Sequence, residues 1–464
     1  MKKHIKIILA AAIAAALALG LASCMDADLS GNNSSGNSGS SVPSGDQSGS
    51  QTLGSFTVSG KNVTLDGSVF TISSAGTYVL SGKLEDGQVV VNAGDNDDVT
   101  LVLSGADISC STGSPILILN GDNVMIEASG GTANSVSDTR SSVSDSEEYD
   151  AAVWSACDLD LSGSGSLTVT SKSCGGVKTK DDLGISSLKL AVSSEGNALK
   201  GNDSVTVSSG TLDLTTKSGD GIKTSNSDIS SKGNQKGSIV ISGGTVSVSA
   251  GGDGLHAEYN VELSQDCVIR VSTDDDALHA VQQIMISGGT LSIDRSHEGL
   301  EANVIDISGG DIFVAADDDG LNATKSGSST PLIKISGGNI EVETSAGDTD
   351  AVDSNGNIDI SGGMLIIKAG SAMGGMAGSM DADGSVKVTG GTVIAFGGIA
   401  STPSGGSVNT IIQRDTTFAA GHYVLADASG NTIAEFDLGS SYSSLWIASD
   451  KLPQNSTYSL NRAE

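Results

Sequence analysis

Short runs of alternating apolar and polar residues recur along this chain at a nearly constant interval. Between residues 242 and 263 the runs are VSV at 246–248, LHA at 255–257 and VEL at 261–263, separated by Gly-rich or polar turns. The same arrangement starts again at residues 264, 287 and 308, so the period is 21 to 23 residues. Alternation with a period of two predicts β-strands whose apolar side chains share one face. Three such strands in every period predict a solenoid.

The pattern predicts an all-β protein, a parallel β-helix with three strands per coil. The crossover rule for parallel strands predicts right-handed winding. A leucine-rich horseshoe has a similar period, but its Leu-rich helical segments and its Asn or Cys ladder are missing here. Weaker repeats extend the expected β-helix over residues 55–400. Residues 404–464 lose the period and predict a small C-terminal β cap, with aromatic residues at Tyr423, Phe436, Trp446 and Tyr458.

The first 54 residues are expected to contain a targeting signal and a tether rather than a folded domain. Three Lys precede an apolar run at 7–19 that is too short to span a membrane. The following LASC at 21–24 resembles the lipobox of bacterial lipoproteins, which predicts a signal peptide over 1–23 and a lipid on Cys24. An ordinary secretory signal with a chance Cys is the alternative. Residues 24–54 are rich in Ser, Gly and Asn and predict a disordered tether. We therefore expect a protein on the extracellular face of the cell envelope, attached to the membrane through lipid only.

Composition narrows the possible partners. Acidic residues outnumber basic ones 55 to 24, and binding to nucleic acid needs clustered Lys and Arg, so nucleic acid is not an expected partner. Apart from Cys24, the Cys residues show no CxxC spacing and are read as small buried residues, with their pairing left open: Cys110, Cys157, Cys174 and Cys267.

Acidic residues fall at one position of the repeat, just before a small residue and an apolar one. In a β-helix this position forms a column with about 4.8 Å between coils, where two like charges repel by about 3.5 kcal/mol at an effective dielectric of 20. Ca²⁺ takes several oxygen ligands and could bridge neighbouring coils, and the small residue after each acid leaves room for it. The alternative is a solvated turn that suits Asp-Gly geometry. The predicted calcium ligands are Asp220, Asp253, Asp276, Glu298, Asp319 and Asp350, with Asp274, Asp275, Asp317, Asp318 and Asp348 beside them.

Three residues after each acid, an outward side chain forms a second column. Ammonium groups at this spacing match the carboxylates of an anionic polysaccharide, and an aromatic face can stack on a sugar ring. The alternative is that the Lys residues neutralise nearby acids and the Trp covers a turn. The predicted polysaccharide-binding residues are Trp154, Lys178, Lys200, Lys223, His256 and His279.

Several motifs together resemble a known family. They are AGTYVLSG at 75–82, DDVTLVLSGADI at 97–108, the repeated ISGG, and DGI or DGL after acidic turns. The chain is similar over residues 56–460 to secreted bacterial carbohydrate-binding proteins with a β-helix like that of pectate lyases. The resemblance implies binding of calcium, cellulose and polygalacturonate. Gly175 and Asn197 depart from the acidic column, and an insertion rich in acids and Ser occupies 132–150.

The expected function is therefore a surface-anchored, calcium-stabilised binder of plant-type polysaccharide, and a monomer is expected. A polysaccharide lyase is a second possibility, in which calcium acidifies a proton next to a uronate carboxyl and a nearby Arg or Lys removes it. Arg270 and Arg295 lie in coils that carry acids, but no catalytic residue is assigned. An adhesin or stalk without a glycan ligand is the third possibility.

Overall fold

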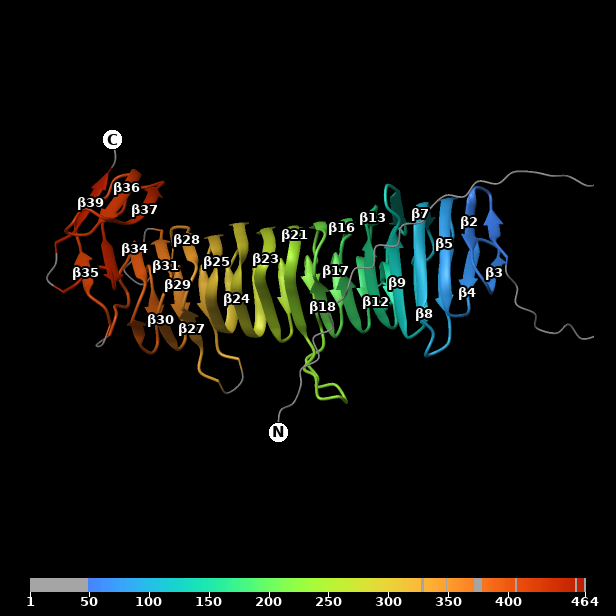
Figure 1. Ribbon diagram of the computed structural model, residues 1–464, viewed down its shortest axis with the longest axis horizontal. Helices are drawn as coiled ribbons and strands as arrows, with labels where there is room; N and C mark the ends of the chain where they lie inside the picture. Colours follow the sequence, from blue (N-terminus) through green and yellow to red (C-terminus); the bar gives the residue numbers. More distant parts are fainter. Residues whose placement is uncertain are drawn as a thin grey trace, which may run out of the picture. The chain divides into compact units, whose positions relative to one another are not determined.

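The computed structural model describes residues 49–462 apart from 145, 327–328, 348, 371–377, 405–406 and 455–456. The described residues belong to one unit, Asp46–Glu464. They form a parallel β-solenoid of about 13 turns without an α-helix, whose coils follow one another along one axis (Figure 1). The predicted signal peptide, Cys24 and most of the predicted tether lie outside the described residues. Within the described part of the chain, no helix is long and apolar enough to cross a membrane.

Parallel strands from successive coils form three faces. Six long strands turn a corner and contribute to more than one face: β5 (Gly76–Leu84), β7 (Val99–Cys110), β21 (Ser238–Ala250), β23 (Asn260–Thr273), β24 (Leu278–Arg295) and β25 (Leu300–Ala316). The first face also contains β4 (Val69–Ile72), β6 (Gln88–Asn92), β8 (Ile116–Asn120), β11 (Ala151–Ser155), β14 (Gly175–Thr179), β17 (Leu199–Gly201), β20 (Ile222–Lys223), β22 (Leu255–Ala257), β26 (Leu321–Ala323), β29 (Val352–Ser354) and β32 (Asp381–Ala382).

The other two faces complete each coil. The second face contains β9 (Asn123–Ala128), β12 (Asp158–Gly163), β15 (Asp182–Ile185), β18 (Ser204–Val207), β27 (Leu332–Ile335), β30 (Asn357–Ile360) and β33 (Val386–Val388). The third face contains β10 (Ala133–Asp138), β13 (Ser166–Ser171), β16 (Lys189–Ser194), β19 (Thr211–Thr216), β28 (Asn339–Thr344), β31 (Met364–Lys368) and β34 (Thr392–Phe396).

The alternation in the sequence places the core as predicted. The inward residues of the coil at 242–263 are each at most 4% exposed: Val246, Val248, Leu255, Ala257, Val261 and Leu263. Aliphatic side chains from all three faces join in one continuous core, so burial of apolar surface stabilises the whole stack. The parallel β-helix with three strands per coil is thus confirmed, while its right-handed winding stays a prediction.

Glycines set the repeated turn between the second and third faces. The second Gly of each SGG motif adopts a positive φ, for example +86° at Gly244, +83° at Gly289 and +103° at Gly310. Residues with a Cβ rarely adopt this conformation, so the motif recurs wherever the chain turns this corner.

The small residue after the acid also has a packing reason where it is Gly. A Cβ at Gly254 would lie 2.5 Å from Val271 Cγ1, and one at Gly299 would lie 2.3 Å from Val314 Cγ1. The Gly254 carbonyl accepts a hydrogen bond from the Ile222 amide, as part of the ladder between coils. Close packing at this inner corner therefore accounts for the small residue, and room for a metal is not needed to explain it.

Both ends of the stack are covered by antiparallel strands. β1 (Gln51–Leu53), β2 (Phe56–Ser59) and β3 (Val63–Asp66) make antiparallel pairs, where weak parallel coils were expected from residue 56, and β1 lies within the last residues of the expected tether. At the other end, β38 (Leu445–Ser449) pairs antiparallel with β34 and β35 (Thr410–Gln413). A three-stranded sheet completes the cap, from β36 (Gly421–Ala426), β37 (Thr432–Leu438) and β39 (Ser459–Arg462). Such caps protect open strand edges from further pairing.

Candidate functional site

Two columns of side chains run along the first face in the predicted register. The strand column holds the residues paired from coil to coil across this face: Trp154, Lys178, Lys200, Lys223, His256, His279, Glu301, Asn322, Asp353 and Asp381. The turn column lies three residues earlier in each coil: Gly175, Asn197, Asp220, Asp253, Asp276, Glu298, Asp319 and Asp350. The parallel ladder fixes both columns at a spacing of about 4.8 Å per coil.

The turn column has a structural role that sequence reasoning missed. Asn197 Oδ1 accepts a hydrogen bond from the Asp220 amide at 2.7 Å, and Asp220 Oδ1 accepts one from the Asp253 amide at 2.9 Å. The series continues from Asp253 to the Asp276 amide at 3.1 Å. Each side chain thus satisfies a backbone N–H of the next coil. The Asn in an otherwise acidic column was the available signal, because an amide oxygen can accept this bond as well as a carboxylate can.

In the middle coils the second carboxylate oxygen meets a basic side chain of the strand column. Lys223 Nζ lies 2.5 Å from Asp220 Oδ2, and His256 Nδ1 lies 2.6 Å from Asp253 Oδ2. At Asp220 the Lys223 ammonium group relieves the repulsion that suggested a calcium ladder, and the Asp253 carboxylate has the His256 ring as a hydrogen-bond partner. Lys223 and His256 are therefore engaged with acids rather than free to meet a ligand.

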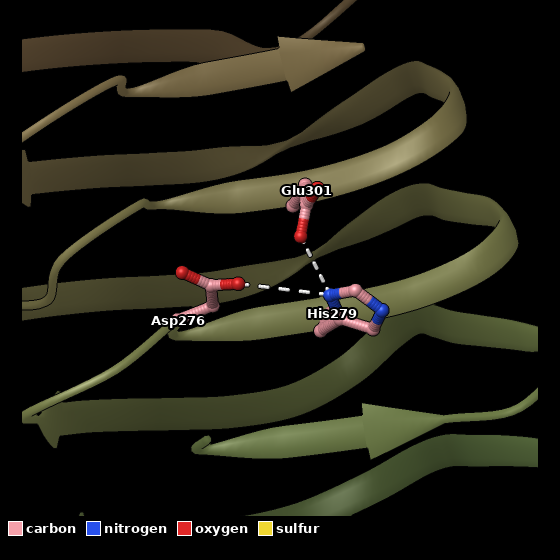
Figure 2. Close-up of side chains that lie close together, drawn as sticks. All are labelled: Asp276, His279 and Glu301. Carbon is pink, nitrogen blue, oxygen red and sulfur yellow. Dashed lines mark hydrogen bonds and ion pairs between the residues drawn. The ribbon is translucent and has the colours of Figure 1, made fainter. Parts of the chain in front are cut away.

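His279 bridges two coils, as Figure 2 shows. Its Nδ1 lies 2.7 Å from Glu301 Oε2 and 3.6 Å from Asp276 Oδ2. Hydrogen bonds to Asp276 and Glu301 raise the pKa of His279 to about 10, and the His279 hydrogen bond lowers the pKa of Glu301. The imidazole also stacks on that of His256, with ring centroids 4.8 Å apart. His279 is therefore a charged counter-ion within the column at neutral pH.

Trp154 keeps its predicted register but does not offer a stacking surface. It is 2% exposed, and Tyr149 packs against it edge-to-face with ring centroids 4.8 Å apart. Lys180 Nζ lies 5.1 Å from the centre of the Trp154 ring. Residues 133–138 of the expected insertion instead form β10, a regular strand of the third face, so only the segment 139–150 lies outside the repeat. The end of this segment folds back over this part of the first face. The prediction of an exposed aromatic platform at Trp154 is therefore wrong.

The coils of Lys178 and Lys200 enclose a cavity of about 270 Å³. Lys178 Nζ lies 2.7 Å from Asp150 Oδ1, at the end of the insertion. Lys200 is half-buried, and no hydrogen bond or ion pair engages its ammonium group within the described part of the chain. Burial, together with the charges of Lys178 and Lys223, lowers the pKa of Lys200. With no acid at 175 or 197, the Lys200 ammonium group has no carboxylate in hydrogen-bond or ion-pair contact in the described structure, and the charges of Asp150 and Asp220 act on it only from farther away.

The opposite arrangement occurs in the coils of Asp350 and Asp353. Carboxylate oxygens of Asp350, Asp353 and Asp381 lie within 4.8 Å of one another. Burial and the nearby Asp319 charge raise the pKa of Asp350 to about 7 and that of Asp353 to about 6. None of the described ion pairs gives these three acids a basic partner.

An unpaired oxygen lies in the strand column beside these acids. Asn322 is 7% exposed and is the register neighbour of Asp353. Its Nδ2 donates to Glu298 of the preceding coil at 3.0 Å, whereas its buried Oδ1 has no hydrogen-bond partner in the described structure. Because the oxygen is on the other side of the amide, it faces away from Glu298. Asn322 thus has a buried amide oxygen without a donor in the described structure, one coil before Asp353.

The remaining predicted metal ligands are divided among several environments. Oxygens of Asp253, Asp275 and Asp276 lie within 4.8 Å of one another, as do ligand atoms of His297, Glu298 and Asp318. Burial and the Asp276 charge raise the pKa of Glu298 to about 8. Asp348 lies outside the described residues.

Exposed Arg residues engage acids at the edge of the coils. Arg295 Nη1 lies 2.8 Å from Asp274 Oδ1, and Arg295 Nε lies 3.9 Å from Asp317 Oδ2. Arg270 Nη1 lies 3.2 Å from Asp294 Oδ2. Both Arg side chains proposed for a lyase therefore have carboxylate partners.

Comparison with known proteins places this geometry in a family. The sequence model of a family described as "Carbohydrate-binding domain-containing protein" matches residues 66–320 and 273–409. A protein of Acetivibrio thermocellus with the same description is 32% identical over 124 residues, which is 26% of this chain and 43% of that protein. The chain thus aligns with less than half of that relative's length. A solved structure titled "Structure of the polysaccharide lyase-like protein from C. thermocellum, Gadolinium derivative" is 27% identical, with a TM-score of 0.40 over 53% of this chain and 85% of that chain.

Proposed function

The chain belongs to the family of carbohydrate-binding domain-containing proteins, and from this premise we propose that it is a calcium-stabilised binder of acidic polysaccharide, held at the cell surface by a lipid. The observation that carries the choice of ligand is the half-buried Lys200, which faces a cavity without a carboxylate partner in the described structure. A carboxylate of polygalacturonate would supply that partner.

Cellulose is the weaker of the two expected ligands. A neutral chain gains most from stacking on aromatic faces. The chain has two Trp residues, and both are buried, Trp154 at 2% and Trp446 at 0% exposure. The proposal therefore favours polygalacturonate over cellulose.

Calcium would act at the acidic end of the strand column. Asp350, Asp353, Asp381 and Asn322 Oδ1 supply only oxygen, the donor that Ca²⁺ prefers. A bound calcium ion would offset the repulsion between these buried carboxylates and so stabilise the coils that carry them. The group of Asp276, His279 and Glu301 fits calcium less well, because its nitrogen ligand already forms an ion pair with both acids.

The binding test uses immobilised pectate, cellulose and xylan, with and without a chelator, while cleavage is followed by the absorbance of unsaturated products. We expect binding to pectate, weaker binding when salt is raised, and no new absorbance. Growth of that absorbance would support the polysaccharide lyase instead. No binding to any glycan by the folded protein would contradict the proposal and favour an adhesin or stalk.

The calcium test measures thermal unfolding against calcium concentration. The melting temperature of the wild-type protein should rise with calcium. At a calcium concentration 100 times the dissociation constant, the free energy of unfolding should increase by about 2.7 kcal/mol. A variant with Asp353→Asn and Asp381→Asn should lose this rise. Asp359→Asn is the matched control, because it removes an exposed acid from the same coils. A melting temperature that does not depend on calcium would contradict this part of the proposal.

The anchoring proposal is tested on the full-length chain in a bacterial host. The wild-type protein should partition with membranes, and Cys24→Ala should abolish both the lipid and normal processing. Equal release of both forms into the medium would contradict the lipid anchor and indicate a plain signal peptide.

A further inference from the structure

The cavity beside Lys200 lies at the point where the acidic turn column is interrupted. Side chains of Lys178, Lys200, Asp150 and Asn197 line it, together with the Gly backbone of neighbouring turns. In later coils an acid three residues before the basic residue pairs with it, as Asp220 pairs with Lys223. At Lys200 the equivalent residue is the neutral Asn197. The interruption therefore creates both the space and the unpaired charge.

The insertion closes this cavity on one side. Val143, Ser144 and Asp150 of the insertion form part of its wall. Beyond Lys178, the next residue of the strand column is Trp154, which Tyr149 covers. An extended chain lying along the strand column from the Lys223 side would thus meet the insertion at Lys178 and could not continue.

A buried ion pair holds the start of this insertion in place. Arg140 is 8% exposed and Asp138 is 1% exposed, and their charged groups lie 2.5 Å apart. Arg140 Nη2 also donates to the Tyr149 carbonyl at 2.9 Å. Removal of one partner of a buried ion pair is strongly destabilising, so the wall is a built part of the fold rather than a loose loop.

The charged side chains that line the cavity leave one positive charge for the carboxylate of a ligand. Asp150 neutralises Lys178, which leaves the Lys200 ammonium group unpaired among the described residues that line the cavity. Burial raises the pKa of the Cys174 thiol in the wall to about 12, so this group adds no negative charge. The volume of about 270 Å³ is close to the lower limit of about 300 Å³ for ligand pockets, and it suits one sugar unit rather than several.

We propose that the Lys200 cavity binds the carboxylate of the terminal sugar of an acidic glycan, so that the protein captures chain ends. This inference rests on the proposed binding of acidic polysaccharide and adds where on the polymer the protein binds. The carboxylate forms a charge-assisted hydrogen bond with Lys200 Nζ, and the rest of the chain extends towards Lys223. Ser173 and Ser218 also line the cavity, and their hydroxyl groups could contact the sugar.

The test measures affinity and stoichiometry by calorimetry with purified galacturonate oligomers of short, intermediate and long length, and with free galacturonate as a competitor. We expect one protein per glycan chain at every length, and competition by free galacturonate. Lys200→Met should weaken the affinity about tenfold or more, because it removes the charge but keeps much of the volume. Lys217→Met is the matched control, since Lys217 is an exposed Lys that pairs with Glu195 and does not line the cavity.

The outcomes separate this inference from the proposed function. If the wild-type protein binds more copies per chain as the oligomer lengthens, or if Lys200→Met binds like wild type with an unchanged melting temperature, end capture is wrong while polysaccharide binding holds. If the folded wild-type protein binds no acidic oligomer, both are overturned.

Discussion

The strand column changes character between its two ends, although the backbone of the coils is the same. In the coils of Lys178 and Lys200 the turn acids are absent, and an ammonium group is left without a partner in the described structure. In the coils of Asp353 and Asp381 the column itself is acidic, and a neighbouring amide oxygen is left without a donor. Since register and spacing are equal, the residue types at two positions per coil decide whether a coil favours an anion or a cation.

The middle coils show what happens when both positions are filled. His256 pairs with Asp253, and His279 lies between Asp276 and Glu301. In these coils the basic side chains are already engaged by acids of the protein itself. A ligand site along this β-helix is therefore a place where one member of an otherwise regular pair is missing.

The largest effect is expected at the closed end of the column. Trp154→Ala should cost about 3–5 kcal/mol of local stability, because it empties a buried site under the insertion. Trp154→Phe should cost clearly less, since the Trp154 Nε1 atom has no hydrogen-bond partner in the described structure. Denaturant unfolding measures both variants. If Trp154→Ala keeps its stability but loses binding to cellulose, Trp154 is an exposed platform after all.

The next effect concerns the charge balance of the middle coils. Because the pKa of His279 is raised from 6.5 to about 10, its stabilisation is fully present below pH 6.5 and is lost as the pH rises through 10. His279→Gln should remove about 1.5–3 kcal/mol at pH 6 and flatten this pH dependence. Titration of the imidazole by NMR gives the direct answer. A midpoint near 6.5 would contradict the counter-ion role of His279.

The smallest effect tests whether one residue converts the anion end into a self-balanced coil. Asn197→Asp should keep the hydrogen bond to the Asp220 amide and place a carboxylate near Lys200, with a gain of at most about 1 kcal/mol. Its main consequence should be weaker binding of galacturonate oligomers. Asn234→Asp, in the exposed loop between β20 and β21, makes the same charge change away from the cavity. Equal affinities of the two variants would show that Asn197 does not keep the cavity open to anions.

Much of this architecture could be predicted from the sequence. The two-residue alternation and the period of 21 to 23 residues were sufficient for the faces, the core and the register of the strand column. The burial of Trp154 could not be predicted, because the residue that covers it, Tyr149, lies in an insertion outside the repeat. The antiparallel strands at the N-terminal end were missed for a similar reason, since capping segments have to depart from the repeat.

The structural role of the acids in the turn column could not be predicted from the sequence either. A column of like charges indicates repulsion, but the hydrogen bonds that Asp220 and Asp253 accept from amides of the next coil depend on where those amides point. The partners of each carboxylate likewise depend on side-chain direction. Only the three-dimensional structure therefore separates acids with a basic partner in the protein from acids such as Asp353 that lack a described one.

The contrast between the two ends is tested most directly by amide hydrogen exchange with and without calcium. Calcium should slow exchange in the turns and strands that carry Asn322, Asp353 and Asp381, and should leave the coils of Lys178 and Lys200 unchanged. The Asp353→Asn and Asp381→Asn variant should show no such protection. Protection that is absent in the wild-type protein, or that is equally strong in the Lys-bearing coils, would contradict the assignment of opposite ligands to the two ends.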